Sequence, residues 1–244
     1  DAIYIEVWAP HTTLGHLGGL LERARAARPA SVPILAAYLS VYANTPVEAA
    51  DTAARLVMAT IFSHGGTHLL NGENNTILVD PYYPNNHSAA ASTRSLMRRW
   101  YDFLVRYGDL LLSPHGVDVS RSYTGGINED LIFDVPDGVR VSTDPEPGTI
   151  WVRIVRTRLG MVVHLINLSN QRDIDWDAPK EAITDIAGVR LRVLKALATG
   201  VPRAADPDRF VALQLLPLSS DGLYDVVELP PLGAWTMVVL PDPQ

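Results

Sequence analysis

The first 112 residues alternate short apolar runs with amphipathic helical patterns, and this alternation restricts the possible folds most. Strands are expected at 3–8, 32–39 and 59–63, and helices at 17–28, 46–58 and 92–112. Thr45-Pro46-Val47-Glu48 has the T-x-x-E pattern of a capping box before the second helix. The order predicts parallel βα units. Three units cannot close a barrel, but they fit the second half of a (β/α)₈ barrel, whose usual length is about 250 residues.

The second half of the chain has a different pattern, made of short β-type runs separated by turns. Two of the turns are Pro136-Asp137-Gly138 and Ser219-Ser220-Asp221-Gly222. Strands are expected at 131–133, 149–156, 161–168, 189–196, 210–216, 223–229 and 234–240. Regular short strands with such turns favour an antiparallel β-sandwich. We therefore expect two domains, a half-barrel at 1–122 and a β-sandwich at 123–244.

Composition excludes several classes of protein. The formal net charge of −7 argues against a nucleic-acid partner, which would require a basic surface. The chain has no cysteine, so it can form neither a disulfide nor a cysteine-based metal site. No apolar run approaches the roughly 18 residues of a membrane span. The sequence opens with Asp1 inside an expected strand, without methionine or signal peptide, and we expect it to be a piece of a longer protein.

Glu6 is the first candidate for chemistry. It lies near the carboxyl end of the first expected strand, where barrel enzymes carry their catalytic groups. Tyr4 and Trp8 flank it, and a carboxyl group partly shielded from water by aromatic rings suits a general acid at neutral pH. The alternative is a glutamate at a strand end that pairs with an arginine.

A polar loop follows the third expected strand and contains His68 and Glu73. Its side chains are suited to hydrogen bonding with sugar hydroxyls. Together with His64 they also offer metal ligands, but the Gly-Gly pair between the histidines disfavours the helix that such spacing needs. A merely solvated loop is the third possibility.

Two further polar positions lie near strand ends. Tyr38 ends the second expected strand, and Asp80 begins a turn that contains two adjacent tyrosines. Tyrosines in a cleft can stack on sugar rings, and in a loop they can equally cover a core. No glycine-rich phosphate loop, dinucleotide fingerprint or G-x-S-x-G elbow is present in the sequence, and we expect no cofactor.

Five segments in this order resemble glycoside hydrolase family 66, which contains dextranases and cycloisomaltooligosaccharide glucanotransferases. They are Ile3–Trp8, Leu35–Tyr38, Gly65–His68 with Gly72-Glu73, Asp80–Pro84 and Tyr101–Tyr107. Val163–Leu168 and Pro230–Leu240 resemble the C-terminal β-domain of the family more loosely.

The resemblance implies a (β/α)₈ barrel followed by an antiparallel β-domain, and retaining endo-cleavage of α-1,6-glucosidic bonds in dextran. It matches the acid/base to Glu6 and places the nucleophile on the preceding barrel strand, upstream of Asp1. Retention requires these two carboxyl groups to lie about 5 Å apart. The candidate substrate contacts are Trp8, Tyr38, His68, Glu73 and Asp80, and neither a metal nor a cofactor is implied.

The resemblance leaves the exact activity open. We see no insertion between the Glu6 strand and the Leu17 helix, where the cyclising enzymes carry a carbohydrate-binding module, and this favours a dextranase. Thr67 stands where an aromatic residue is expected. The alternatives are a cyclising glucanotransferase and a non-catalytic carbohydrate-binding protein.

The same resemblance suggests a setting for the protein. We expect a secreted bacterial protein whose partners are a glucan substrate and the missing N-terminal part of the same barrel. Without that part, we expect the 244 residues alone to be inactive.

Overall fold

The computed structural model describes residues 2–197 and 199–242, which form two compact units. The first unit contains the chain up to Pro114 and a separate segment, Asp173–Ala182. The second contains His115–Arg172 and the chain from Ile183 onward. The segment 173–182 therefore follows part of the second unit in sequence but belongs to the first.

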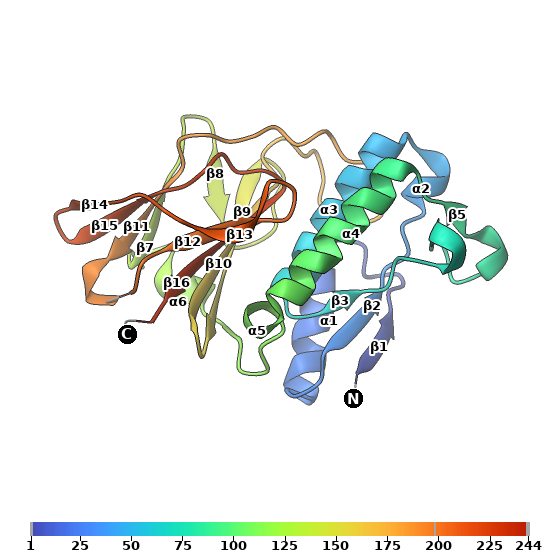
Figure 1. Ribbon diagram of the computed structural model, residues 1–244, viewed down its shortest axis with the longest axis horizontal. Helices are drawn as coiled ribbons and strands as arrows, with labels where there is room; N and C mark the ends of the chain where they lie inside the picture. Colours follow the sequence, from blue (N-terminus) through green and yellow to red (C-terminus); the bar gives the residue numbers. More distant parts are fainter. Residues whose placement is uncertain (1, 198, 243–244) are drawn as a thin grey trace. The chain divides into compact units, whose positions relative to one another are not determined.

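A small parallel sheet organises the first unit (Figure 1). It consists of β1 (Ile3–Glu6), β2 (Pro33–Ala36) and β3 (Thr67–His68), in that spatial order. Glu6 lies opposite Ala36, and Leu35 lies opposite His68, so the carboxyl ends of all three strands lie at one edge. The first two expected strands are thus present and parallel, and β3 takes the place of the third. The sheet is open, and the described residues contain no closed barrel.

Helices cover this sheet, with α1 and α3 contacting it and α4 packing on α3 (Figure 1). Leu14, Leu17 and Leu21 lie one helical turn apart on α1 and are fully buried. The remaining core of the unit includes Trp100 and Phe103 of α4. The helices and the accessory hairpin strands are α1 (Leu14–Ala27), α2 (Val41–Asn44), α3 (Val47–Ser63), α4 (Ala91–Arg106), α5 (Gly108–Leu111), β4 (Thr76–Ile77) and β5 (His87–Ser88).

The strand expected at 59–63 is wrong, because these residues are the last turns of α3. Thr60 Oγ1 donates to the Leu56 carbonyl, and Ser63 Oγ donates to the Thr60 carbonyl, as hydroxyls within a helix do. The capping box is also wrong. Thr45 Oγ1 instead donates to the Val41 carbonyl at the end of α2, and α3 begins without a side-chain cap.

The helix expected at 92–112 is interrupted near its end. α4 stops at Arg106, Tyr107 leaves helical geometry with ψ of 24°, and α5 starts at Gly108. Its apolar stripe is nevertheless as expected, because Leu96, Trp100 and Phe103 are all buried.

The second unit consists of two sheets (Figure 1). The larger has the order β13-β12-β16-β10-β9-β6, with β8 pairing on β9, and the smaller has the order β14-β15-β11-β7. Pairings are antiparallel apart from that of β8 with β9, which is parallel. The elements are β6 (Val117–Asp118), α6 (Ser120–Tyr123), β7 (Leu131–Asp134), β8 (Arg140–Ser142), β9 (Thr149–Thr157), β10 (Gly160–Asn167), β11 (Arg190–Leu194), β12 (Arg203–Asp206), β13 (Phe210–Leu215), β14 (Leu218–Asp221), β15 (Tyr224–Glu228) and β16 (Trp235–Pro241).

One apolar core lies between these two sheets. Val163 of β10 and Val238 of β16 contribute from the larger sheet, and Leu191 of β11 and Val227 of β15 from the smaller. All seven strands expected in this half are confirmed, within two residues at each end. Within the described residues, no helix is long and apolar enough to cross a membrane.

Candidate active site

The carboxyl edge of the parallel sheet brings three of the expected site residues together. Glu6 ends β1, Trp8 follows it two residues later, and Tyr38 follows β2. The rings of Trp8 and Tyr38 lie 6.2 Å apart between centroids. Parallel pairing of β1 with β2 produces this grouping, because it aligns the two strand ends.

Three side chains, those of Tyr4, Tyr38 and Trp8, form a hydrogen-bond network around the Glu6 carboxylate. The hydroxyls of Tyr4 and Tyr38 donate to Glu6 Oε1 over 3.0 and 3.1 Å. Trp8 Nε1 donates to Glu6 Oε2 over 3.3 Å. The two carboxylate oxygens are therefore held differently, Oε1 by two donors and Oε2 by one.

Tyr4 is the member of this network that sequence reasoning does not propose as a site residue. The sequence does contain the information needed to find Tyr4, because side chains two residues apart in a strand point to the same face, as Tyr4 and Glu6 do. Burial and the hydrogen bonds with Tyr4 and Glu6 raise the pKa of the Tyr38 hydroxyl. Tyr38 therefore stays protonated, and able to donate, over the whole physiological pH range.

Glu6 is less shielded from water in the structure than the sequence predicts. Glu6 is exposed, and the side chains of Tyr4 and Trp8 are each 52 % exposed. β1 is the edge strand of the described sheet, so its aromatic neighbours contact the carboxylate without enclosing it. An ion pair with arginine, the other possibility for this residue, does not occur among the ion pairs of the described residues.

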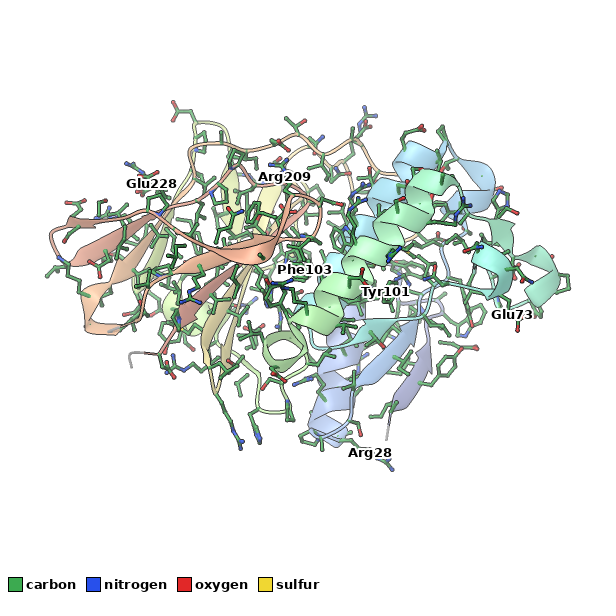
Figure 2. All side chains as sticks on the ribbon, viewed as in Figure 1. Arg28, Glu73, Tyr101, Phe103, Arg209 and Glu228 are labelled. Atoms are coloured by element: carbon green, nitrogen blue, oxygen red, sulfur yellow. The ribbon has the colours of Figure 1, made fainter. Side chains whose placement is uncertain are left out.

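His68 lies at the end of β3, but it is buried rather than open to a ligand. Its Nε2 is 2.8 Å from the Ala37 carbonyl oxygen, to which it donates, and its Nδ1 has no hydrogen-bond partner in the described structure. Burial lowers the pKa of His68 to about 4, against a smaller opposing effect of that hydrogen bond. The imidazole is thus neutral at pH 7. The hydroxyl of Tyr101, labelled in Figure 2, donates to the His68 carbonyl.

Glu73 lies away from this network, in a 3₁₀ turn spanning Glu73–Asn75 (Figure 2). Its side chain is exposed, and its carbonyl accepts a hydrogen bond from Thr76 Oγ1. The structure does not gather His64, His68 and Glu73 into a ligand set. Among the described residues, no group of three or more histidines, aspartates and glutamates could hold a metal ion.

Asp80 is close to the strand ends and organises its own loop. Its Oδ1 accepts the Tyr82 backbone N–H, and its Oδ2 accepts Asn85 Nδ2, both over 2.7 Å. Asp80 also lines a cavity of about 430 Å³ that Trp8 and Tyr38 line as well. Three of the expected substrate contacts thus share one cavity beside Glu6.

The family model for glycosyl hydrolase family 66 matches residues 1–239. The chain belongs to this family. Family membership confirms the resemblance drawn from the sequence motifs.

Two relatives from Niallia circulans, both named cycloisomaltooligosaccharide glucanotransferase, align with the chain. One is 29 % identical over 194 residues, which is 76 % of this chain and 19 % of the relative. The other is 33 % identical over 123 residues, 50 % of this chain and 12 % of the relative. The chain therefore spans about a fifth or less of the length of these family members.

A solved structure has the same fold. It is the cycloisomaltooligosaccharide glucanotransferase of Paenibacillus sp. complexed with cycloisomaltoheptaose. The TM-score is 0.84 at 18 % identity, over 98 % of this chain and 52 % of that one. At this identity the similarity establishes the arrangement of the backbone.

Proposed function

We propose that this chain carries the acid/base residue of a retaining glycosidase that cleaves α-1,6-glucosidic bonds in dextran-like glucans. The observation that carries the proposal is the Glu6 carboxylate, held at a strand end by Tyr4, Tyr38 and Trp8. In the first step Glu6 protonates the glycosidic oxygen, and in the second it deprotonates the attacking water or sugar hydroxyl.

The proposal includes the architecture. The three βα units are the second half of a (β/α)₈ barrel, and the two sheets of the second unit are the β-sandwich that follows it. The nucleophile is an aspartate on the barrel strand before β1, about 5 Å from Glu6. A polymeric substrate cannot enter a cell, so the protein acts outside it.

The test uses the whole protein with Glu6→Gln. An amide cannot donate a carboxylic proton, so dextran cleavage should fall about 100-fold or more. The Glu6→Ala variant should regain turnover of an aryl glycoside when azide is added. The aryl leaving group needs no proton in the first step, and azide attacks in the second step without a general base.

Glu48→Gln is the matched control, because Glu48 is an exposed glutamate in the first turn of α3. It should leave activity unchanged. Near-normal dextran cleavage by Glu6→Gln would contradict the proposal. Binding of dextran without cleavage by the wild-type protein would indicate the non-catalytic alternative.

Cyclising transfer is the second candidate, and the names of the two Niallia circulans relatives favour it. Transfer differs from hydrolysis in the last step, where a hydroxyl of the same glucan chain replaces water. Product analysis on dextran distinguishes them, because transfer yields cyclic isomaltooligosaccharides and hydrolysis yields linear ones.

A further inference from the structure

A strap, defined as residues 173–182, runs along the first unit although it lies between β10 and β11 in the sequence. Its backbone pairs with the chain around the start of α1. The Leu14 N–H donates to the Ile174 carbonyl over 2.8 Å, and the Trp176 N–H donates to the Thr12 carbonyl over 3.0 Å. The strap is thus bonded to the loop that follows β1 and Glu6.

Side chains fix the strap at two further points. Asp177 accepts hydrogen bonds from Ser40 Oγ at 2.6 Å and from the Val41 N–H at 3.2 Å, at the start of α2. Trp176 Nε1 donates to the His11 carbonyl over 2.7 Å. These hydrogen bonds anchor the strap to the first unit.

The strap forms one wall of the cavity beside Glu6. Asp175, Trp176 and Asp177 line it from the strap, and Trp8 and Tyr38 line it from the strand ends. Its volume of about 430 Å³ lies in the range of small-molecule sites. Aromatic faces with nearby carboxylates suit a sugar ring, which has apolar faces and donates through its hydroxyls.

The Glu6 carboxylate indicates which part of the substrate this cavity would hold. Oε1 accepts from two tyrosines, whereas Oε2 accepts only from Trp8 within this network, so Oε2 has more capacity left for a substrate. Trp8, which donates to Oε2, and Tyr38, which donates to Oε1, both line the cavity, so the carboxylate lies beside it. An acid next to the cavity would transfer its proton to the oxygen of the sugar bound there.

We propose that the cavity binds the glucose unit on the leaving-group side of the scissile bond, the position that an acceptor sugar occupies in transfer. Asp175 accepts hydrogen bonds from its hydroxyls, Trp176 forms the wall, and Asp177 positions the strap. This assignment rests on the proposed role of Glu6.

Asp175→Ala in the whole protein tests the assignment. Asp175 is exposed, so its side chain can be removed without disturbing a core. On dextran, kcat/KM should fall at least tenfold. On 4-nitrophenyl α-isomaltoside, where an aryl group replaces the leaving sugar, it should change less than twofold. Asp109→Ala, an exposed aspartate of the same unit outside the cavity, should change neither.

Binding provides a second measurement that does not depend on turnover. Isomaltotriose should bind the Glu6→Gln variant at least fivefold more weakly when Asp175→Ala is added. Equal losses on both substrates, or unchanged dextran cleavage and unchanged binding, would overturn the assignment while leaving the role of Glu6 intact. Failure of Glu6→Gln to reduce cleavage would instead contradict the proposed function.

Discussion

The hydroxyl of Tyr38 donates to Glu6 Oε1 from the neighbouring strand, over 3.1 Å. Tyr4 reaches the same oxygen from within β1, and the two hydroxyl oxygens lie 3.2 Å apart. One carboxylate oxygen is therefore oriented by two phenols, either of which can hold it when the other is absent.

Because either hydroxyl can orient Glu6, the losses in kcat/KM caused by removing the two hydroxyls should not be additive. Tyr4→Phe and Tyr38→Phe should each lower kcat/KM on dextran only about threefold, because the other hydroxyl still orients Glu6. The double variant should lose about 30-fold or more, since a hydrogen bond to a charged group contributes about 1.5–3 kcal/mol. A double-mutant cycle on purified protein measures this, and strictly additive losses would contradict shared orientation.

The strap contains an ion pair whose two partners differ in burial. The Lys180 side chain is 2 % exposed and bonds to Asp173, which is 45 % exposed. Asp173→Asn should destabilise the strap by about 1–3 kcal/mol, because it leaves a buried ammonium without its carboxylate. Lys180→Met should cost less, because the remaining carboxylate is partly in water.

Limited proteolysis within 173–182 and the melting temperature would measure this difference. The side-chain oxygen left in the Asp173→Asn variant can still accept the hydrogen bond that Asp173 Oδ1 accepts from the Asp175 N–H, so the comparison isolates the charge. Faster cleavage of the Lys180→Met variant than of the Asp173→Asn variant would refute the argument.

Asp206 predicts a pH dependence of stability in the second unit. It is 1 % exposed, its Oδ2 has no hydrogen-bond partner in the described structure, and burial raises its pKa to about 6 from an ordinary 3.8. At a pH between these two pKa values, the Asp206 carboxyl group is protonated in the folded protein and ionised in the unfolded chain. The contribution of Asp206 to stability therefore falls as pH rises from about 4 to 6, and it returns on acidification.

Asp206→Asn removes this titration. The variant should be more stable than wild type at pH 7, by up to about 3 kcal/mol. This figure is the difference between the folded and the unfolded pKa of Asp206 multiplied by 1.36 kcal/mol per pKa unit. The advantage should disappear as pH approaches 4. Melting temperatures of both proteins from pH 4 to 7 give the difference, and a constant difference would rule out the titration of Asp206.

Arg209→Gln, at the residue labelled in Figure 2, should lower stability at pH 7, because this guanidinium lowers the pKa of Asp206 and so favours the carboxylate.

The sequence predicts the second unit better than the first. Strands such as β9 and β10 are long apolar runs bounded by Pro147-Gly148 and by Leu159-Gly160, so local pattern is sufficient to locate them. A continuous apolar run such as 59–63 is ambiguous, because a helix buried on most sides has the same composition as a buried strand. Only packing within the folded unit decides between the two.

The candidate site shows the same limit. Glu6, Trp8 and Tyr38 can be found from the sequence because strand-end position is a local property. The strap cannot, because its partners, such as Ser40 for Asp177, lie 137 residues away in the sequence. Its only local sign is Trp176, an aromatic residue between two aspartates and outside any expected strand.

The course of the strap also has an evolutionary consequence. The gene segment for one wall of the cavity lies within the segment for the β-rich unit, so the two are inherited together. Recombination between family members with a crossover anywhere in 115–172 would exchange that wall along with the downstream strands. Chimeras made this way should therefore inherit their acceptor preference from the parent of the second unit, even though Glu6 comes from the other parent.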